Sequence, residues 1–217
     1  TNAGNNVTTF AASASTTVSF TDLNALTLGT VGASNGFTAT TGVSGSTHNL
    51  ATLAGNLAVN AQITASGTTR LTAGGTGNIT QTALINSPTL GVRAGGSVTL
   101  DNSSNAITTV AGEASSGAFS FRDINGFTVA TVTASGAFSS AATGVLTNGS
   151  QILLRGAGNI SLISQVNALG GAAGPGNVGI ITTSGQISQP VNAQGLRASV
   201  LALSAPGNIL LDNSIAD

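Results

Sequence analysis

The chain has few charged residues, and its basic residues are of a single type. Only 5% of its 217 residues are charged, against about a quarter in ordinary soluble domains. The five basic residues are all Arg, they are scattered along the chain, and the formal net charge is −1. Nucleic acids and anionic membrane surfaces are bound by clustered Lys and Arg, so we expect neither as a partner.

Cysteine, methionine, tryptophan and tyrosine are absent. Without Cys there is no disulfide framework and no thiol chemistry. No apolar run approaches the roughly 18 residues of a membrane span, so membrane insertion is not expected. The opening residues, TNAGNN, have neither the basic nor the apolar part of a signal peptide. We therefore expect that they are not the natural start of a precursor.

The residues that are present favour short strands. Hydrophobic residues make up 41% of the chain and the mean hydropathy is +0.35, which is enough to build a core rather than a disordered linker. Thirty Gly, much Thr, Ser and Asn, and a single Glu form a poor helix inventory. Alternating segments such as VTL (98–100), ISL (160–162) and FTVATV (127–132) predict strands, separated by Gly, Asn and Ser turns.

An internal repeat organises the whole chain. Residues 19–37 match residues 120–138 at an offset of 101, with ten of the nineteen positions identical. Further matches pair 5–11 with 105–111, 55–63 with 158–166, 77–81 with 185–189 and 96–103 with 207–214. The chain thus divides into units 1–104 and 105–217 of one continuous structure. The growing offset places most of the inserted residues in 168–178, a Gly/Ala/Pro-rich loop.

A shorter motif recurs within the units and indicates the fold. G-[NSQ]-[IV]-x has its apolar residue at Ile79, Val98, Ile160, Ile187 and Ile209, with gaps of 19, 62, 27 and 22. We interpret 62 as about three times 20, and about 20 residues is one coil of a parallel β-helix. Gly permits a tight corner, and the β-branched residue stacks inward on its counterpart one coil away. The prediction is an all-β, right-handed parallel β-helix (β-solenoid) of about ten coils.

The repeated strings resemble a known family. NNVTTF…SFTDLNALTLGTVGASNGF and its second copy resemble the tandem repeats of filamentous-haemagglutinin-type bacterial surface proteins, the large exoproteins of two-partner secretion. The resemblance covers nearly the whole chain. It implies a right-handed parallel β-helical shaft without catalytic residues, located outside the cell or on the bacterial surface. It also implies that partners are adjacent solenoid repeats and surface glycans or proteins.

The few acidic residues recur at equivalent places. Asp22 and Asp123 share the context S-F-x-D-[LI]-N, and Asp101 and Asp212 share L-D-N-S. They are either paired carboxylates or a Ca²⁺ site, or Asx turns at coil corners, and we favour the turns. A Ca²⁺ roll fails at AGGTGNI (73–79) because Ile79 stands where Asp is needed. We expect no catalytic, metal-binding or cofactor-binding residues.

The remaining polar residues also favour structural roles. His48 is the only His and lies in a polar stretch, so we expect an exposed turn residue rather than a metal or triad site. Glu113 and Asp217 have no evident partner. Arg93 and Arg155 occur in matching contexts, VRAGGSVTL and LRGAGNISL. They are either a ligand-binding row or solvated edge residues that discourage aggregation, and we favour the latter.

The seven Phe cluster in 10–37 and 119–138, where we expect thicker core layers rather than a sugar-stacking platform. The main functional hypothesis is an adhesive or structural shaft that presents binding regions away from the cell. The alternatives are a filament subunit that stacks end to end through uncapped ends, and a polysaccharide-acting β-helix enzyme. An ice-binding surface would need T-x-T on nearly every coil, but TAT occurs at 38–40 and the coil motifs do not repeat it.

Overall fold

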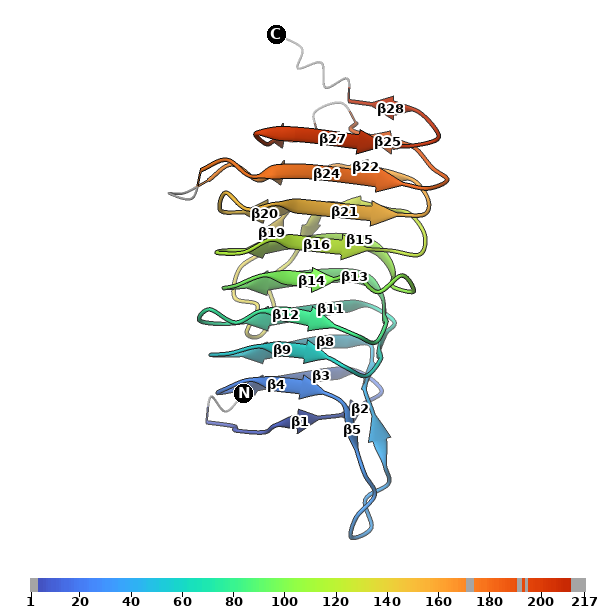
Figure 1. The fold of residues 1–217 in the computed structure, drawn as a ribbon. Helices are drawn as coiled ribbons and strands as arrows, with labels where there is room; N and C mark the ends of the chain where they lie inside the picture. The colour runs from blue at the N-terminus through green and yellow to red at the C-terminus, as the bar shows by residue number, and fades with distance from the viewer. Residues whose placement is uncertain (1–3, 171–173, 191–192, 194, 212–217) are drawn as a thin grey trace.

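The computed structural model describes residues 4–170, 174–190, 193 and 195–211. Within them the chain is all-β, contains no helix that could span a membrane, and winds into a stack of parallel strands (Figure 1). This architecture is consistent with the predicted β-solenoid. Face 1 is a nine-stranded parallel sheet. Its strands, in spatial order, are β1 (Thr9–Phe10), β4 (Leu26–Leu28), β9 (Leu57–Val59), β12 (Ile79–Gln81), β14 (Val98–Leu100), β16 (Phe119–Arg122), β21 (Ile152–Gly156), β24 (Asn177–Thr182) and β27 (Val200–Ser204).

A fifteen-stranded sheet forms the other two faces. Two of its strands, β13 and β15, are long enough to bend round the corner and belong to both faces. Face 2 contains β2 (Ala12–Ser13), β7 (Val43–Gly45), β10 (Ile63–Ala65), β13 (Ile85–Ala94), β15 (Ala106–Ala114), β17 (Phe127–Val129), β22 (Ile160–Leu162), β25 (Ile187–Ser188) and β28 (Ile209–Leu210). Face 3 contains β3 (Thr17–Asp22), β8 (Thr47–Thr52), β11 (Thr68–Ala73), β13, β15, β20 (Val145–Thr147), β23 (Val166–Asn167) and β26 (Leu196–Arg197).

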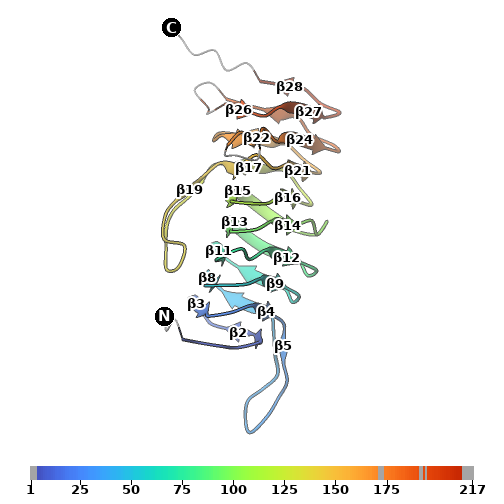
Figure 2. The same ribbon diagram turned by 60° about the vertical axis from the view of Figure 1, so that its left-hand side comes forward.

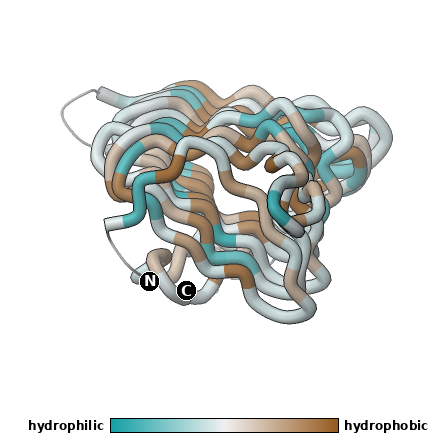
Figure 3. The backbone as a smooth tube through the Cα atoms, turned by 90° about the horizontal axis from the view of Figure 1, so that it is seen from below, coloured by the Kyte–Doolittle hydropathy of each residue, from teal (hydrophilic) through white to brown (hydrophobic). Residues whose placement is uncertain are grey.

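The core consists of columns of apolar side chains that run along the stack. Strand residues alternate between inside and outside, and the register aligns inward residues of successive strands. The longest column on face 1 is Leu26, Leu57, Ile79, Val98, Phe119, Ile152 and Val178, each at most 1% exposed. Seen along the stack, hydrophobic positions of successive turns lie over one another (Figure 3).

Two antiparallel hairpins interrupt the winding and project from it. We call residues 30–41 arm 1, with β5 (Thr30–Val31) and β6 (Thr40–Thr41), and residues 131–143 arm 2, with β18 (Thr131–Val132) and β19 (Ala142–Thr143). The sequence interpretation read FTVATV as strand but did not identify either hairpin. Asn35-Gly36, both at positive φ (48° and 84°), was the available signal for the tight turn of arm 1.

The second repeat unit is turned by one face relative to the first. Phe20 of β3 pairs with Leu50 on face 3, whereas its equivalent Phe121 of β16 pairs with Leu154 on face 1. Likewise β4 lies on face 1 and its equivalent β17 on face 2. Arm 1 therefore leaves the corner between faces 1 and 2, and arm 2 leaves the corner between faces 2 and 3 (Figure 2).

This rotation corrects one part of the sequence interpretation. The motif residues stack as predicted within each unit, Ile79 on Val98 and Ile160 on Ile187 and Ile209. The first pair lies on face 1, however, and the other three lie on face 2. The gap of 62 between Val98 and Ile160 is therefore not three whole coils. It contains arm 2 and a step from one face to the next.

Removing one inward side chain tests the column. Ile79→Ala should lower the free energy of unfolding by about 2–4 kcal/mol, because Ile79 is fully buried and leaves a cavity between its neighbours. Thr80→Ala, one residue away on the outer side, should change it by less than about 0.5 kcal/mol. Urea unfolding followed by circular dichroism measures both, and equal losses for the two variants would contradict the column.

Candidate functional surface

Arm 2 lies against the outside of face 3 and forms a second, small apolar cluster. Val132, Phe138 and Ala142 of the arm pack on Ala111 of β15, and all four are at most 3% exposed. Gly91 of β13 allows this approach, because a Cβ there would lie 2.9 Å from Val132 Cγ1 and 3.1 Å from Phe138 Cζ. The shaft surface under the arm is thus shaped to receive it.

Polar contacts hold the far part of arm 2. Arg70 of β11 donates from Nε to the Thr133 carbonyl oxygen (2.7 Å) and from Nη2 to Thr133 Oγ1 (3.1 Å). Asn49 of β8 donates to Ser135 Oγ (3.3 Å) near the tip. Arg70 is only 6% exposed, and burial lowers the pKa of its guanidinium. Among the described residues no carboxylate forms an ion pair with it, so backbone, hydroxyl and amide oxygens, the last from Asn49, solvate this cation.

Arg93 of β13 contacts arm 2 near its base. Its Nη1 pairs with Glu113 (2.8 Å), its Nη2 donates to the Ala141 carbonyl oxygen (2.7 Å), and its guanidinium lies 5.1 Å from the Phe138 ring centroid. A cation over an aromatic face is attractive. Glu113 therefore has a partner, contrary to the sequence interpretation, because the parallel register places it beside Arg93.

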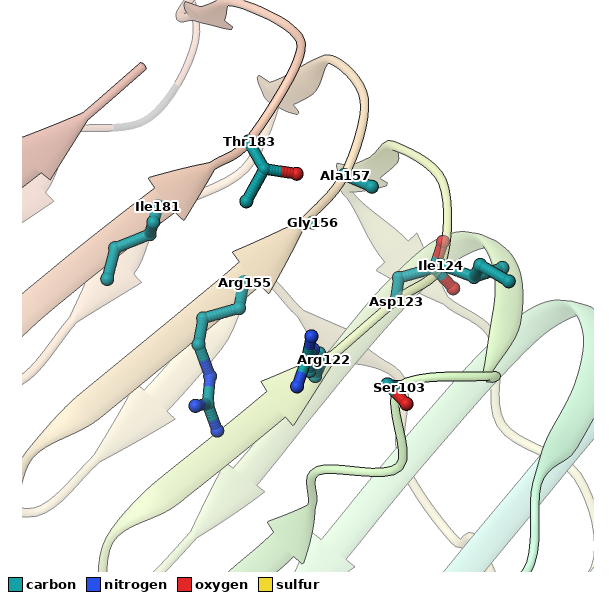
Figure 4. A pocket seen from close by; sticks show the side chains of 9 residues that line it. All are labelled: Ser103, Arg122, Asp123, Ile124, Arg155, Gly156, Ala157, Ile181 and Thr183. Atoms are coloured by element: carbon teal, nitrogen blue, oxygen red, sulfur yellow. The ribbon is translucent and has the colours of Figure 1, made fainter. Parts of the chain in front are cut away.

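The second surface feature is a pocket of about 330 Å³ where face 1 turns into face 2 (Figure 4). Arg122 and Arg155, register neighbours on β16 and β21, contribute two guanidinium groups to it. Arg155 pairs with Asp101 (2.7 Å), which also accepts a hydrogen bond from Ser120 (2.6 Å). This pocket therefore offers cationic hydrogen-bond donors, one of them already neutralised by Asp101.

Arg93 and Arg155 form neither a ligand-binding row nor a pair of edge residues. Arg93 lies on face 3 and Arg155 on face 1, each on a strand with neighbours on both sides. The two Arg have matching sequence contexts because similar turns recur round the stack, but the strands that carry them belong to different faces. Both are only partly exposed, at 25% and 32% of the side chain, and both are ion-paired.

Asp22 and Asp123 form Asx turns, which confirms that interpretation for these two residues, whereas Asp101 bonds to Arg155 and Ser120 instead. Each accepts at Oδ1 from the amide two residues later, Asn24 (2.9 Å) and Asn125 (2.7 Å). Each also accepts at Oδ2 from an amide of the preceding turn, Val7 (2.8 Å) and Ile107 (2.7 Å). These carboxylates join adjacent turns of the stack at two different corners. Asp212 and Asp217 lie outside the described residues.

The carboxyl group of Asp123 has a shifted pKa. Its burial raises its pKa to about 6, against the opposing effect of the hydrogen bonds from the Asn125 and Ile107 amides. Although Asp123 borders the pocket with the two Arg, both of its oxygens are already engaged by backbone amides.

His48 is buried, so its assignment as an exposed turn residue was wrong. It lies in β8 at 0% exposure, with Nδ1 3.3 Å from Thr69 Oγ1 and no hydrogen-bond partner for the buried Nε2. Burial lowers the pKa of His48, and the Ser44 backbone, which accepts from the ring, partly offsets this. The residues next to His48 in the sequence are polar, which suggested an exposed turn. Its burial is instead decided by the alternation of side chains along the strand and by packing against the neighbouring strands.

The aromatic residues divide between core and surface. Phe119 and Phe121 are fully buried, and Phe121 meets Phe127 edge-on at 5.0 Å, so these residues thicken the core as predicted. Phe10 and Phe20 are partly buried and stack at 4.3 Å. Phe37 in arm 1 is the exception, at 50% exposure.

The inserted loop 168–178 closes on itself in the part that is described. The Gly176 amide donates to the Ala168 carbonyl oxygen (2.9 Å), and Ala168 is fully buried. Residues 171–173 lie outside the described residues. Among the described residues, no cluster of three or more His, Asp or Glu side chains is placed to hold a metal ion.

The buried ring of Phe138 should determine whether arm 2 stays docked. Phe138→Ala removes the ring that packs on Ala111 and Arg93 and should weaken docking by about 2–4 kcal/mol. Amide hydrogen exchange in 131–143 should then accelerate more than tenfold. Phe37→Ala should leave exchange in arm 1 nearly unchanged in the isolated chain, because Phe37 is half exposed. Unchanged protection of arm 2 in Phe138→Ala would refute the docking.

The raised pKa of Asp123 predicts a pH dependence of stability. A carboxyl group whose pKa is higher when folded binds its proton more tightly in the folded state. Its contribution is full below about pH 4 and is lost as the pH rises through about 6. The stability of the wild-type chain relative to Asp123→Asn, which cannot ionise, should therefore fall over this range. NMR titration of the Asp123 carboxyl carbon checks the cause, and a midpoint below pH 4 would contradict it.

Comparisons with models of protein families, with curated proteins and with solved structures find no match to this chain.

Proposed function

We propose that the chain is a structural and adhesive shaft segment of a large extracellular or surface-anchored bacterial adhesin or fibre. The repeated strings that resemble filamentous-haemagglutinin-type proteins support this proposal. The stacked ladder supports it too, because a stack of strands about 4.8 Å apart extends in one direction and separates its two ends. The nine strands of face 1 span roughly 40 Å on this spacing. We take each of these strands as one coil of a right-handed solenoid. This gives nine coils, close to the ten coils of about 20 residues that the sequence predicts.

The observation that carries the proposal is how the acidic residues are used. Asp22 and Asp123 accept backbone amides, while Asp101 and Glu113 pair with Arg155 and Arg93. Every acidic residue of the described part thus has its partner within the stack. Glycoside hydrolysis needs two carboxyl groups that face a substrate. This use of the acids favours a scaffold over a polysaccharide-acting enzyme.

A second candidate, a filament subunit, is favoured by the last strands of the stack. Val200 and Leu201 of β27 and Ile209 and Leu210 of β28 are 42–57% exposed. The inward residues among them, such as Leu201 and Ile209, continue the buried columns and have no following strand within the described residues. An open edge of this kind is a template for further strands.

The shaft proposal is tested by imaging and binding on the same sample. Negative-stain electron microscopy should show short rods, and a glycan array should show no saturable binding to the 217-residue chain. Tight binding that is lost on Arg122→Ala, with the fold intact, would place a receptor site in the shaft. Cleavage of an acidic polysaccharide that is lost on Asp123→Asn or Asp22→Asn would replace the proposal with an enzyme.

A further inference from the structure

Arm 1 resembles arm 2 in sequence, but no surface among the described residues lies under it. Both begin Thr-Val and place a Phe after the turn, with Val31 equivalent to Val132 and Phe37 to Phe138. Phe138 is 1% exposed, whereas Phe37 is 50% exposed. The difference lies in position: arm 2 descends over earlier strands of the stack, whereas arm 1 extends past β1, beyond the first strands of the stack (Figures 1 and 2).

The surface under arm 2 is a row of outward residues on face 3. This row, which we call row 1, is in register across β3, β8, β11, β13 and β15 and consists of Ser19, Asn49, Arg70, Gly91 and Ala111. The apolar contacts of arm 2 lie at Gly91 and Ala111, and its hydrogen bonds lie at Asn49 and Arg70.

The second repeat unit carries an equivalent row, which we call row 2, on face 1. It runs in register across β16, β21, β24 and β27 and consists of Ser120, Leu153, Gly179 and Ala202. The inward neighbours of the two rows correspond as well, with Leu50, Leu71 and Val92 matching Leu154, Ile180 and Leu203. No arm of the described chain covers row 2, and Ala202 is exposed at its end.

Continuing the internal symmetry of the chain into a second molecule would place arm 1 of that molecule on row 2. Unit 2 follows unit 1 by a step along the stack and a turn of one face. Repeating that step after unit 2 puts the first unit of the next copy on the last strands of this one. The β3 strand of the next copy then lies beside β28 of this copy, in the same way that β16 lies beside β14 within one chain. Arm 1 of the next copy then descends over face 1. Ala11 is the sequence equivalent of Ala111. Row 2 would therefore continue from Ala202 to Ala11 of that copy, just as row 1 continues from Gly91 to Ala111.

The side chains of arm 1 and row 2 also suit one another. In arm 2, Thr133 accepts two hydrogen bonds from Arg70, one at its carbonyl oxygen and one at its hydroxyl group. The equivalent positions are Gly32 in arm 1 and Gly179 in row 2, so the hydroxyl group and the guanidinium group that would bind it are both absent. What remains is apolar: by equivalence with the contacts of Val132 and Phe138 at Gly91 and Ala111, Val31 and Phe37 would lie against Ala202 and Ala11.

We propose that a second copy of this chain is the partner of arm 1, which clasps Leu153, Gly179 and Ala202 of the copy beneath it. The proposal builds on the shaft function by specifying how shafts join. Because the arm and the row are different surfaces at opposite ends, the contact is heterologous and propagates as an open filament. Because each copy comprises two units, successive copies are turned by two faces.

A pair of introduced cysteines tests the contact directly, because the chain has no Cys of its own. In the intramolecular counterpart, a Cβ on Gly91 lies 3.4 Å from Val132 Cβ, close to the spacing of a disulfide, about 3.5–4.5 Å. The double variant Val31→Cys, Ala202→Cys should therefore oxidise to a ladder of disulfide-linked oligomers. Gly91→Cys, Val132→Cys should give only an internal disulfide. Val31→Cys, Ser161→Cys, with the second cysteine on face 2, is the mismatched control.

Blocking each surface separately tests the polarity. Phe37→Asp disables the arm and Ala202→Arg disables the row, and each should weaken self-association in sedimentation velocity at least tenfold. Asn35→Asp, which adds the same charge at the arm tip, should associate like the wild type. A mixture of the Phe37→Asp and Ala202→Arg chains keeps one intact arm and one intact row, so it should form dimers and nothing longer.

Three results would overturn the proposal: a wild-type chain that stays monomeric at high concentration, equal cross-linking of the matched and mismatched pairs, or filaments that persist in Phe37→Asp. The first would mean that arm 1 has another occupant, such as further coils of a longer chain. Electron microscopy of the same samples separates this failure from failure of the shaft function, because single rods would remain visible.

Discussion

The structure depends on the stacking of identical kinds of side chain, strand upon strand, inside a parallel ladder. Many of its strands are only two or three residues long and could not persist alone. Each is held by hydrogen bonds to the strands before and after it and by an inward residue that completes a column such as Leu57, Ile79 and Val98. The buried columns and the backbone ladder use the same register, so a strand that slipped by one residue would lose both. Stability is therefore shared between neighbouring turns, and the outermost turns are the weakest.

The three faces are close to equivalent, and this explains the rotation of the repeat. Gly, Asn and Asx turns close many of the corners, while β13 and β15 bend round theirs without a break, and each face needs only an inward apolar residue at alternate positions. Asp22 makes its two backbone contacts where face 3 meets face 1, and Asp123 makes the same contacts where face 1 meets face 2. A repeat that advances by a fraction of a turn therefore keeps all of its local interactions. The two arms, which are equivalent in sequence, consequently leave from different corners and meet different surroundings.

Much of this architecture could be predicted from the sequence, and the failures have physical causes. The strands, the Asx turns at Asp22 and Asp123 and the stacking of Ile79 on Val98 follow from local chemistry and alternation. The rotation does not, because the same local sequence suits any face. His48 and Glu113 were misassigned because their surroundings come from strands about twenty residues away. The contacts of Arg70 and Arg93 with arm 2 depend on a hairpin whose sequence also fits a strand. The one turn signal, Asn35-Gly36, lies in arm 1, and the equivalent residues in arm 2 are Gly136 and Ala137.

The central claim is that the second unit is turned by one face, and the junction between the units tests it most directly. Thr99 of β14 and Ser120 of β16 are outward register partners on face 1. If the units were related by whole turns, β14 would instead adjoin β17, and Thr99 would lie beside Thr128. Thr99→Cys can be combined with Ser120→Cys or with Thr128→Cys and treated with dibromobimane, which bridges only neighbouring thiols. The account predicts a fluorescent internal cross-link in the Thr99–Ser120 pair alone, and cross-linking of the Thr99–Thr128 pair instead would contradict it.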